Sequence, residues 1–256
     1  MRTANRIQSI AVAWVVATAF SPLVSGTEGA TDACSFRPIR ESTSPDGKHA
    51  LAWGFAKQNV NWKKYDHGEG SCDYMEAEAP GLGDGMPRNY LVDLRGNKAL
   101  REVGGGHFGD KARYNHITCE ARWSPDSALL VQLNSGKWSY RVCCAYRIGK
   151  DGDCSDPLDL GSLATNAALA WMKKTGHPAY AARAREIGAV NIEIQKVTDS
   201  GDIEMRLIGE HPAKDGGDSD DAFEVGVIIK AAMNQKGKLQ GSVEKVWNAA
   251  TPADNP

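Results

Sequence analysis

The chain lacks a surplus of positive charge and, beyond its first residues, any long apolar run. Its 256 residues include 30 Lys and Arg against 32 Asp and Glu, so the formal net charge is −2. Binding to a nucleic-acid backbone needs clustered positive charge, and we therefore expect no nucleic-acid partner. A helix that crosses a membrane needs about 20 apolar residues in a row. No segment after residue 26 has them, so no transmembrane segment is expected there.

Signatures of catalysis and of metal binding are also missing. The cysteines never form the CxxC pairs typical of zinc sites and redox centres, and no G-x-S-x-G sequence marks a hydrolase nucleophile. Residues 104–109 match the spacing G-x-G-x-x-G, but they lead towards a further strand and not into the helix that a dinucleotide site requires. Acidic residues at 151–156 and 215–221 lack the EF-hand order, which favours solvated turns over calcium sites. We expect no cofactor and no metal.

The N-terminus has the three-part layout of a secretory signal peptide. Two arginines supply a positive start, residues 10–20 an apolar run, and Pro22 a break before small residues. Cleavage after Gly26 fits this layout best, and cleavage after Ala19 is the alternative. We therefore expect residues 1–26 to be removed, and the protein to be periplasmic or secreted.

All cysteines lie beyond the expected signal peptide. They are Cys34, Cys72, Cys119, Cys143, Cys144 and Cys154. In an oxidising compartment this even number predicts three disulfides, without deciding their connectivity. Successive side chains of a strand point to opposite faces, so Cys144, which shares a face with Tyr146, is expected inward and Cys143 outward. Cys154 could then close a small loop with either one, and Cys34 could pair with Cys72; a strained vicinal bridge is the alternative.

Two stretches share the same order of turn, strand, connection and strand. Residues 44–47 (Ser-Pro-Asp-Gly) have the composition of a type I turn, and residues 50–55 then alternate small and large side chains as a strand does. Residues 123–126 (Trp-Ser-Pro-Asp) lead in the same way into an alternating run at 129–133. The two Ser-Pro-Asp turns begin 80 residues apart, and Ser127 stands where the first copy has glycine.

These stretches resemble the repeat of TolB-like β-propellers, the Pro-Asp-centred relatives of WD-type blades. Residues 44–48 with Leu-Ala-Trp at 51–53, and residues 123–126 with Leu-Leu-Val at 129–131, carry the resemblance, which covers about residues 36–160. It implies propeller-blade-like antiparallel sheets, although two units are too few to close a propeller. The whole chain is also similar to a class of exported bacterial proteins in which such a strand is followed by a helical pair.

The pattern then becomes helical. Residues 163–174 are rich in alanine and straight-chain residues and end before Gly176, and a second helix is expected from Pro178 to Gly188. Strict alternation returns from residue 190 and predicts a four-stranded antiparallel meander whose apolar face the helices cover. The expected fold class is therefore mainly β. The expected parts are a signal peptide at 1–26, a blade-like β module at 34–160, the helical pair and meander at 161–248, and a flexible tail at 249–256.

Two loops carry the residues that could bind a ligand. The insert between the first two strands holds Trp62 and Tyr65. Rings on an otherwise polar loop either stack on a sugar or anchor a partner, or fold back over the sheet core. His107, Asp110 and His116 lie close together in the next long loop, but their irregular spacing does not indicate a metal site.

The sequence favours an exported, non-enzymatic binding or accessory protein of the bacterial envelope, with a protein or a glycan as its ligand. No recognisable residue combination supplies a nucleophile, a base and a group that orients them, and strands joined by long decorated loops are a common binding platform. The lack of any N-x-Ser/Thr acceptor also fits a bacterial exported protein. Two alternatives stay open: a secreted hydrolase that uses His107, Asp110 or His116, and an interaction partner of another envelope protein.

Overall fold

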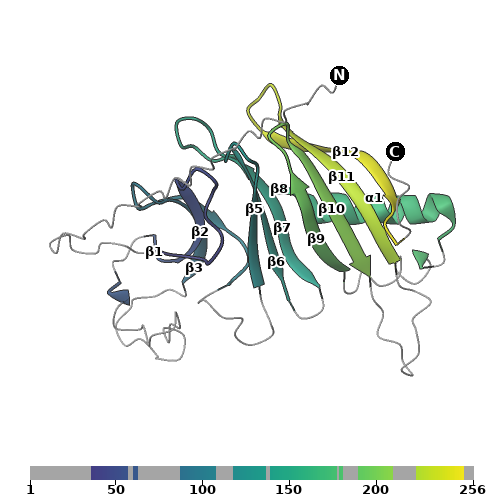
Figure 1. Ribbon diagram of the computed structural model, residues 1–256, viewed down its shortest axis with the longest axis horizontal. Coiled ribbons are helices and arrows are strands. Elements are labelled where there is room, and N and C mark those ends of the chain that lie inside the picture. The colour runs from purple at the N-terminus through teal and green to yellow at the C-terminus, as the bar shows by residue number, and fades with distance from the viewer. Residues whose placement is uncertain are drawn as a thin grey trace, which may run out of the picture. The chain divides into compact units, whose positions relative to one another are not determined.

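The computed structural model describes most of the chain after residue 35. The described ranges are 36–56, 60–62, 87–107, 118–136, 139–177, 179–180, 190–209 and 223–250. All of them belong to one compact unit, Asp32–Pro256. Within them the chain forms three four-stranded antiparallel sheets and the helix α1, so the expectation of a mainly β fold is confirmed (Figure 1). The signal-peptide prediction lies outside the described residues.

Each sheet is a meander, because its four strands pair in the order in which they follow along the chain. The first sheet contains β1 (Phe36–Pro38), β2 (His49–Gly54), β3 (Arg88–Asp93) and β4 (Lys98–Val103). The second contains β5 (Thr118–Trp123), β6 (Leu129–Ser135), β7 (Tyr140–Arg147) and β8 (Leu158–Asp159). The third contains β9 (Val190–Val197), β10 (Asp202–Gly209), β11 (Phe223–Met233) and β12 (Leu239–Asn248), so the meander expected after residue 190 is confirmed.

The two Ser-Pro-Asp turns are built by the same hydrogen bonds. The serine hydroxyl donates to the aspartate Oδ1, over 2.7 Å between Ser44 and Asp46 and 2.6 Å between Ser124 and Asp126. The same hydroxyl accepts the backbone N–H of the first residue of β2 or β6, over 3.0 and 2.9 Å. Burial alone would raise the pKa of Asp46, but hydrogen bonds from Lys48 and Ser44 hold it well below its ordinary value. In the second turn, the hydrogen bond from Ser124 is the main cause that lowers the pKa of Asp126.

Each of these turns also donates a hydrogen bond to a turn of the next sheet. The backbone N–H of Asp46 donates to the hydroxyl of Ser127 in the second turn, over 3.1 Å. The equivalent N–H of Asp126 donates to Oδ1 of Asp199, in the turn between β9 and β10, over 2.8 Å. The three sheets are therefore linked in sequence through their first turns.

This link explains why the second turn departs from the first at one position. Gly47 has φ 70°, and Ser127 adopts almost the same left-handed conformation with φ 62°. A residue with a side chain costs about 1–2 kcal/mol there. The Ser127 hydroxyl, which accepts the N–H of Asp46, offsets part of that cost.

Two hydrophobic cores lie on opposite faces of the second sheet. One face packs against the first sheet and joins Leu51 and Trp53 with Leu130 and Tyr146. The other face packs with α1 and the third sheet in a single core. That core crosses the boundary expected at residue 160, so the second and third sheets are stabilised by the same buried apolar surface.

The cysteine pair of β7 is divided between these two cores. Cys143 is 1% exposed and belongs to the core shared with α1, whereas Cys144 packs against the core shared with the first sheet. The expectation that the two side chains point to opposite faces is confirmed. The expectation that Cys143 points outward is wrong, because the face that it shares with Arg141 and Arg147 is covered at the centre of the strand and open only towards its ends.

The helix α1 (Leu160–Thr175) begins three residues earlier and ends one residue later than expected, at the predicted Gly176 stop. Asp159 caps its start by accepting the N–H of Ser162 over 2.9 Å, and Gly176 ends it with φ 66°. Its buried stripe faces the third sheet and β7, and consists of Leu160, Gly161, Ala164, Thr165, Ala168 and Met172. Of the second expected helix, the structure describes Ala179 and Tyr180. No helix in the described part of the chain is long and apolar enough to cross a membrane.

Candidate functional site

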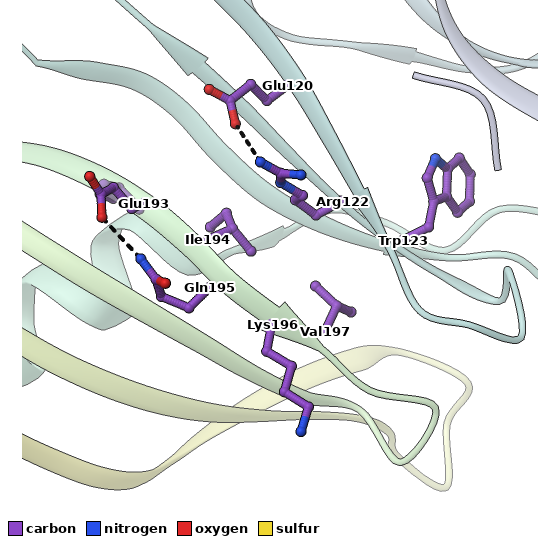
Figure 2. Close-up of a pocket in the computed structure, with 9 residues that line it drawn as sticks. Glu120, Arg122, Trp123, Glu193, Ile194, Gln195, Lys196 and Val197 are labelled. Carbon is purple, nitrogen blue, oxygen red and sulfur yellow. Dashed lines mark hydrogen bonds and ion pairs between the residues drawn. The ribbon is translucent and has the colours of Figure 1, made fainter. Parts of the chain in front are cut away.

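A groove of about 580 Å³ separates the first strand of the second sheet from the first strand of the third. Figure 2 shows the residues that line it, which are Glu120, Arg122 and Trp123 of β5 and Ile192, Glu193, Ile194, Gln195, Lys196 and Val197 of β9. The two strands lie more than 65 residues apart in the sequence. The groove is thus a product of how the sheets pack.

Both strands that bound the groove are edge strands. β5 is the terminal strand of the second sheet and pairs with β6, and β9 is the terminal strand of the third sheet and pairs with β10. Among the described strands, none pairs with the second side of either one. Edge strands of this kind present backbone N–H and C=O groups that another extended chain can satisfy.

Alternation along the two strands decides which side chains reach the groove. On β5, Glu120 and Arg122 are exposed, while Trp123 and its alternating neighbours pack towards the first sheet. On β9, Ile192, Ile194 and Val197 are buried in the shared core, whereas Glu193, Gln195 and Lys196 are exposed. The groove therefore has charged rims beside an apolar strand face.

The polar side chains of the rims interact along their own strands. Arg122 Nη2 lies 3.5 Å from Glu120 Oε2, and Gln195 Nε2 donates to Glu193 Oε2 over 2.9 Å. Figure 2 shows one such contact on each strand. Within the described residues, no hydrogen bond or ion pair joins the β5 rim to the β9 rim. Both rims thus keep hydrogen-bonding capacity for a ligand between them.

The lining residues suit binding better than covalent chemistry. They include no serine, cysteine or histidine that could act as nucleophile or base. Elsewhere in the described residues, no group of three or more His, Cys, Asp or Glu side chains could hold a metal ion. What the groove does offer is two open strand edges, two carboxylates, one guanidinium and one ammonium.

Trp62, expected as a candidate binding residue, packs inside the protein. It is 9% exposed, and its ring meets Trp53 edge-on with the ring centroids 4.9 Å apart. The guanidinium carbon of Arg37 lies 6.0 Å from the centroid of each ring. This arrangement corresponds to the alternative in which the insert folds back over the sheet core. Tyr65 lies outside the described residues.

His107 is held at the opposite end of the sheets from the Ser-Pro-Asp turns. Its backbone N–H donates to Oδ1 of Asn89 over 2.8 Å, and its carbonyl accepts from Nδ2 of the same residue over 2.7 Å. The residue is 8% exposed and does not line the groove. The two other candidates of that loop, Asp110 and His116, lie outside the described residues.

Buried amides explain the glycine-rich stretch that precedes His107. Gln132 Nε2 donates to the carbonyl of Gly104 over 2.6 Å. Gly105 has φ 121°, and a Cβ there would lie 2.4 Å from the side chain of Asn134. These amides were not expected as structural residues, and the signal that could have revealed them is a polar side chain on a strand with otherwise apolar neighbours.

The four described cysteines are free thiols, which are Cys119, Cys143, Cys144 and Cys154. Three disulfides would require at least one bond among these four, and the small loop between Cys154 and Cys143 or Cys144 stays a prediction. Burial raises the pKa of Cys119 to about 12 and that of Cys144 to about 11, which makes both poor nucleophiles at neutral pH. Cys34 and Cys72 lie outside the described residues.

A second cleft, of about 490 Å³, lies where the two Ser-Pro-Asp turns meet. Two of its carboxylates already have partners: Asp46 forms an ion pair with Lys48, and Asp126 accepts hydrogen bonds from Ser124 and Ala128. The His49 ring lies 6.3 Å from the Trp123 ring and is stacked on it. Contacts between the first two sheets thus form part of the wall of this cleft.

Comparison with known proteins adds no assignment to this geometry. No family model matches the chain, and no curated protein is significantly similar to it. The function is therefore argued from the groove itself.

Proposed function

We propose that the protein is an exported, non-enzymatic binding protein of the bacterial envelope, and that its groove takes an extended segment of a partner protein as an additional strand. One observation carries this proposal: β5 and β9, which bound the groove, are each terminal in their sheet. In β-strand addition, backbone hydrogen bonds to such an edge supply affinity, and contacts of alternate side chains supply specificity.

The dimensions and lining of the groove support a strand as the occupant. Residues 192–197 line one side, and six residues of strand span about 17 Å at the usual rise. An incoming strand with alternating side chains would place apolar residues near Ile192 and Ile194 and polar ones at the rims. Arg122 and Lys196 would attract its acidic residues, and Glu120 its basic ones.

We also infer that the three sheets are propeller-blade-like. Support comes from their meander order and from the hydrogen bonds that link each first turn to the next sheet. The described residues form three such sheets, fewer than the four or more of a closed propeller. An unclosed set of blades leaves the edges of β5 and β9 open to a partner.

A displayed library of random heptapeptides, panned on the purified protein, tests the groove. We expect enriched peptides to alternate apolar and charged residues, and a synthetic consensus peptide to shift the amide NMR signals of β5 and β9. The double variant Arg122→Glu, Lys196→Glu should weaken its binding at least tenfold. The double variant Lys236→Glu, Lys238→Glu, an equal charge change in the exposed β11–β12 turn, should leave binding unchanged.

Three outcomes would contradict this function: no enriched peptide, signal shifts confined to other strands, or equal affinity in the double variant. The hydrolase alternative predicts instead that His107→Ala abolishes a hydrolytic activity, whereas our proposal expects peptide binding to survive that change. Export is tested on its own by N-terminal sequencing of the protein from a periplasmic extract, which should begin after Gly26.

A further inference from the structure

The outer face of the third sheet carries a row of four residues, one on each strand, on the side of the sheet away from its hydrophobic core. Register aligns Glu193 of β9 with Arg206 of β10, Arg206 with Gly226 of β11, and Gly226 with Trp247 of β12. Val246, which directly precedes Trp247 on β12, packs against the hydrophobic core. Because successive side chains of a strand point to opposite faces, the indole of Trp247 lies on the outer face. The row therefore joins one aromatic ring and one guanidinium on a polar surface.

Glycine at the centre of the row lets the indole lie on the backbone. A Cβ at Gly226 would stand 2.1 Å from Cε2 and 2.2 Å from Cζ2 of Trp247. Any larger residue would push the ring off the sheet. The indole remains partly exposed to solvent, and Lys245 Nζ lies 5.3 Å from its centroid. A large ring on an edge strand is thus held in place without being buried.

Charged side chains held in ion pairs lie on the same face as this ring. Arg206 forms an ion pair with Glu224 and a second one with Glu193, where Nη1 lies 3.6 Å from Oε2. These contacts hold the guanidinium on the far side of Gly226 from Trp247, in the same cross-strand row. The remaining N–H groups of its two Nη atoms, the carboxylate oxygens and the ammonium of Lys245 supply donors and acceptors on this face.

We propose that this row, centred on Trp247, is a binding site for a sugar ring of a β-1,4-linked, gluco-configured oligosaccharide. Such a ring has flat faces of axial C–H groups that pack on an indole, and equatorial hydroxyls that reach hydrogen-bonding groups around it. A protein partner would be anchored instead by side chains that enter well-packed, desolvated pockets. An open platform with paired charges at its border fits the chemistry of a polyhydroxyl ligand.

Titration of the purified protein with chitotetraose and with cellotetraose, followed by calorimetry and tryptophan fluorescence, tests this site. We expect binding of at least one tetrasaccharide, a loss of at least tenfold in Trp247→Ala, and a smaller loss in Trp247→Phe, which keeps a flat ring. Gly226→Ala should also weaken binding, because its methyl group displaces the indole. Trp171→Phe, a control on α1, should bind like the unaltered protein.

The proposal is overturned if neither tetrasaccharide binds, or if Trp247→Ala binds as tightly as the unaltered protein. Far-UV circular dichroism of each variant distinguishes loss of the site from loss of the fold. If Trp247→Ala does not fold, Trp247→Phe still tests the site, because it keeps a flat ring. Because Trp247 does not line the β5–β9 groove, Trp247→Ala should keep its affinity for the groove peptide. The two sites can therefore fail independently.

Discussion

The hydroxyl of Ser127 offers a quantitative test of how the sheets are linked. Ser127 is 4% exposed, has φ 62°, and accepts the N–H of Asp46 over 3.1 Å. In Ser127→Ala this hydrogen bond is lost while the left-handed strain remains, so the free energy of unfolding should fall by about 1 kcal/mol. In Ser127→Gly the same bond is lost but a strain of about 1 kcal/mol is released, so the free energy of unfolding should change little.

Urea unfolding followed by far-UV circular dichroism measures both variants. The midpoint should move to lower urea in Ser127→Ala and stay nearly constant in Ser127→Gly, with unchanged slopes in both, since the surface exposed on unfolding is the same. The reasoning fails if alanine leaves the midpoint unchanged, or if glycine destabilises as much as alanine. The first result would mean that the hydroxyl contributes nothing, and the second that strain at this position is negligible.

Two further predictions concern titratable groups. The pKa of Asp126 is lowered in the folded protein, chiefly by the Ser124 hydroxyl, so its stabilisation is complete above the unfolded pKa and is lost as the pH falls through the folded value. Acid unfolding curves of Asp126→Asn should therefore depend less on pH below about 4 than those of the unaltered protein, and superimposable curves would refute this. Cys143, buried and with a raised pKa, should react with iodoacetamide at pH 8 far more slowly in the native protein than in urea. Mass mapping of rapid native alkylation at Cys143 would contradict its placement in the core.

Local patterns in the sequence were sufficient for most elements of the fold. The Ser-Pro-Asp turns, the alternation of β2 and β6, and the four strands after residue 190 were all predicted, because a turn network or a period of two is contained within a few neighbouring residues. The end of α1 was also predicted from Gly176, whereas its earlier start depends on the Asp159 cap. The strand period likewise separated Cys143 from Cys144.

The sites depend instead on residues that come together only when the sheets pack. Alternation assigns a side chain to one face of a strand, but it cannot say that both faces of the second sheet are covered, and so Cys143 was misplaced. Glu120 and Glu193 line the same groove because the second and third sheets share a core, and Gly226 lies under Trp247 because of strand register. Neighbours along the chain determine secondary structure through short-range geometry. These contacts depend instead on which distant segments pack or pair with one another, and the alternation of apolar residues does not record that choice.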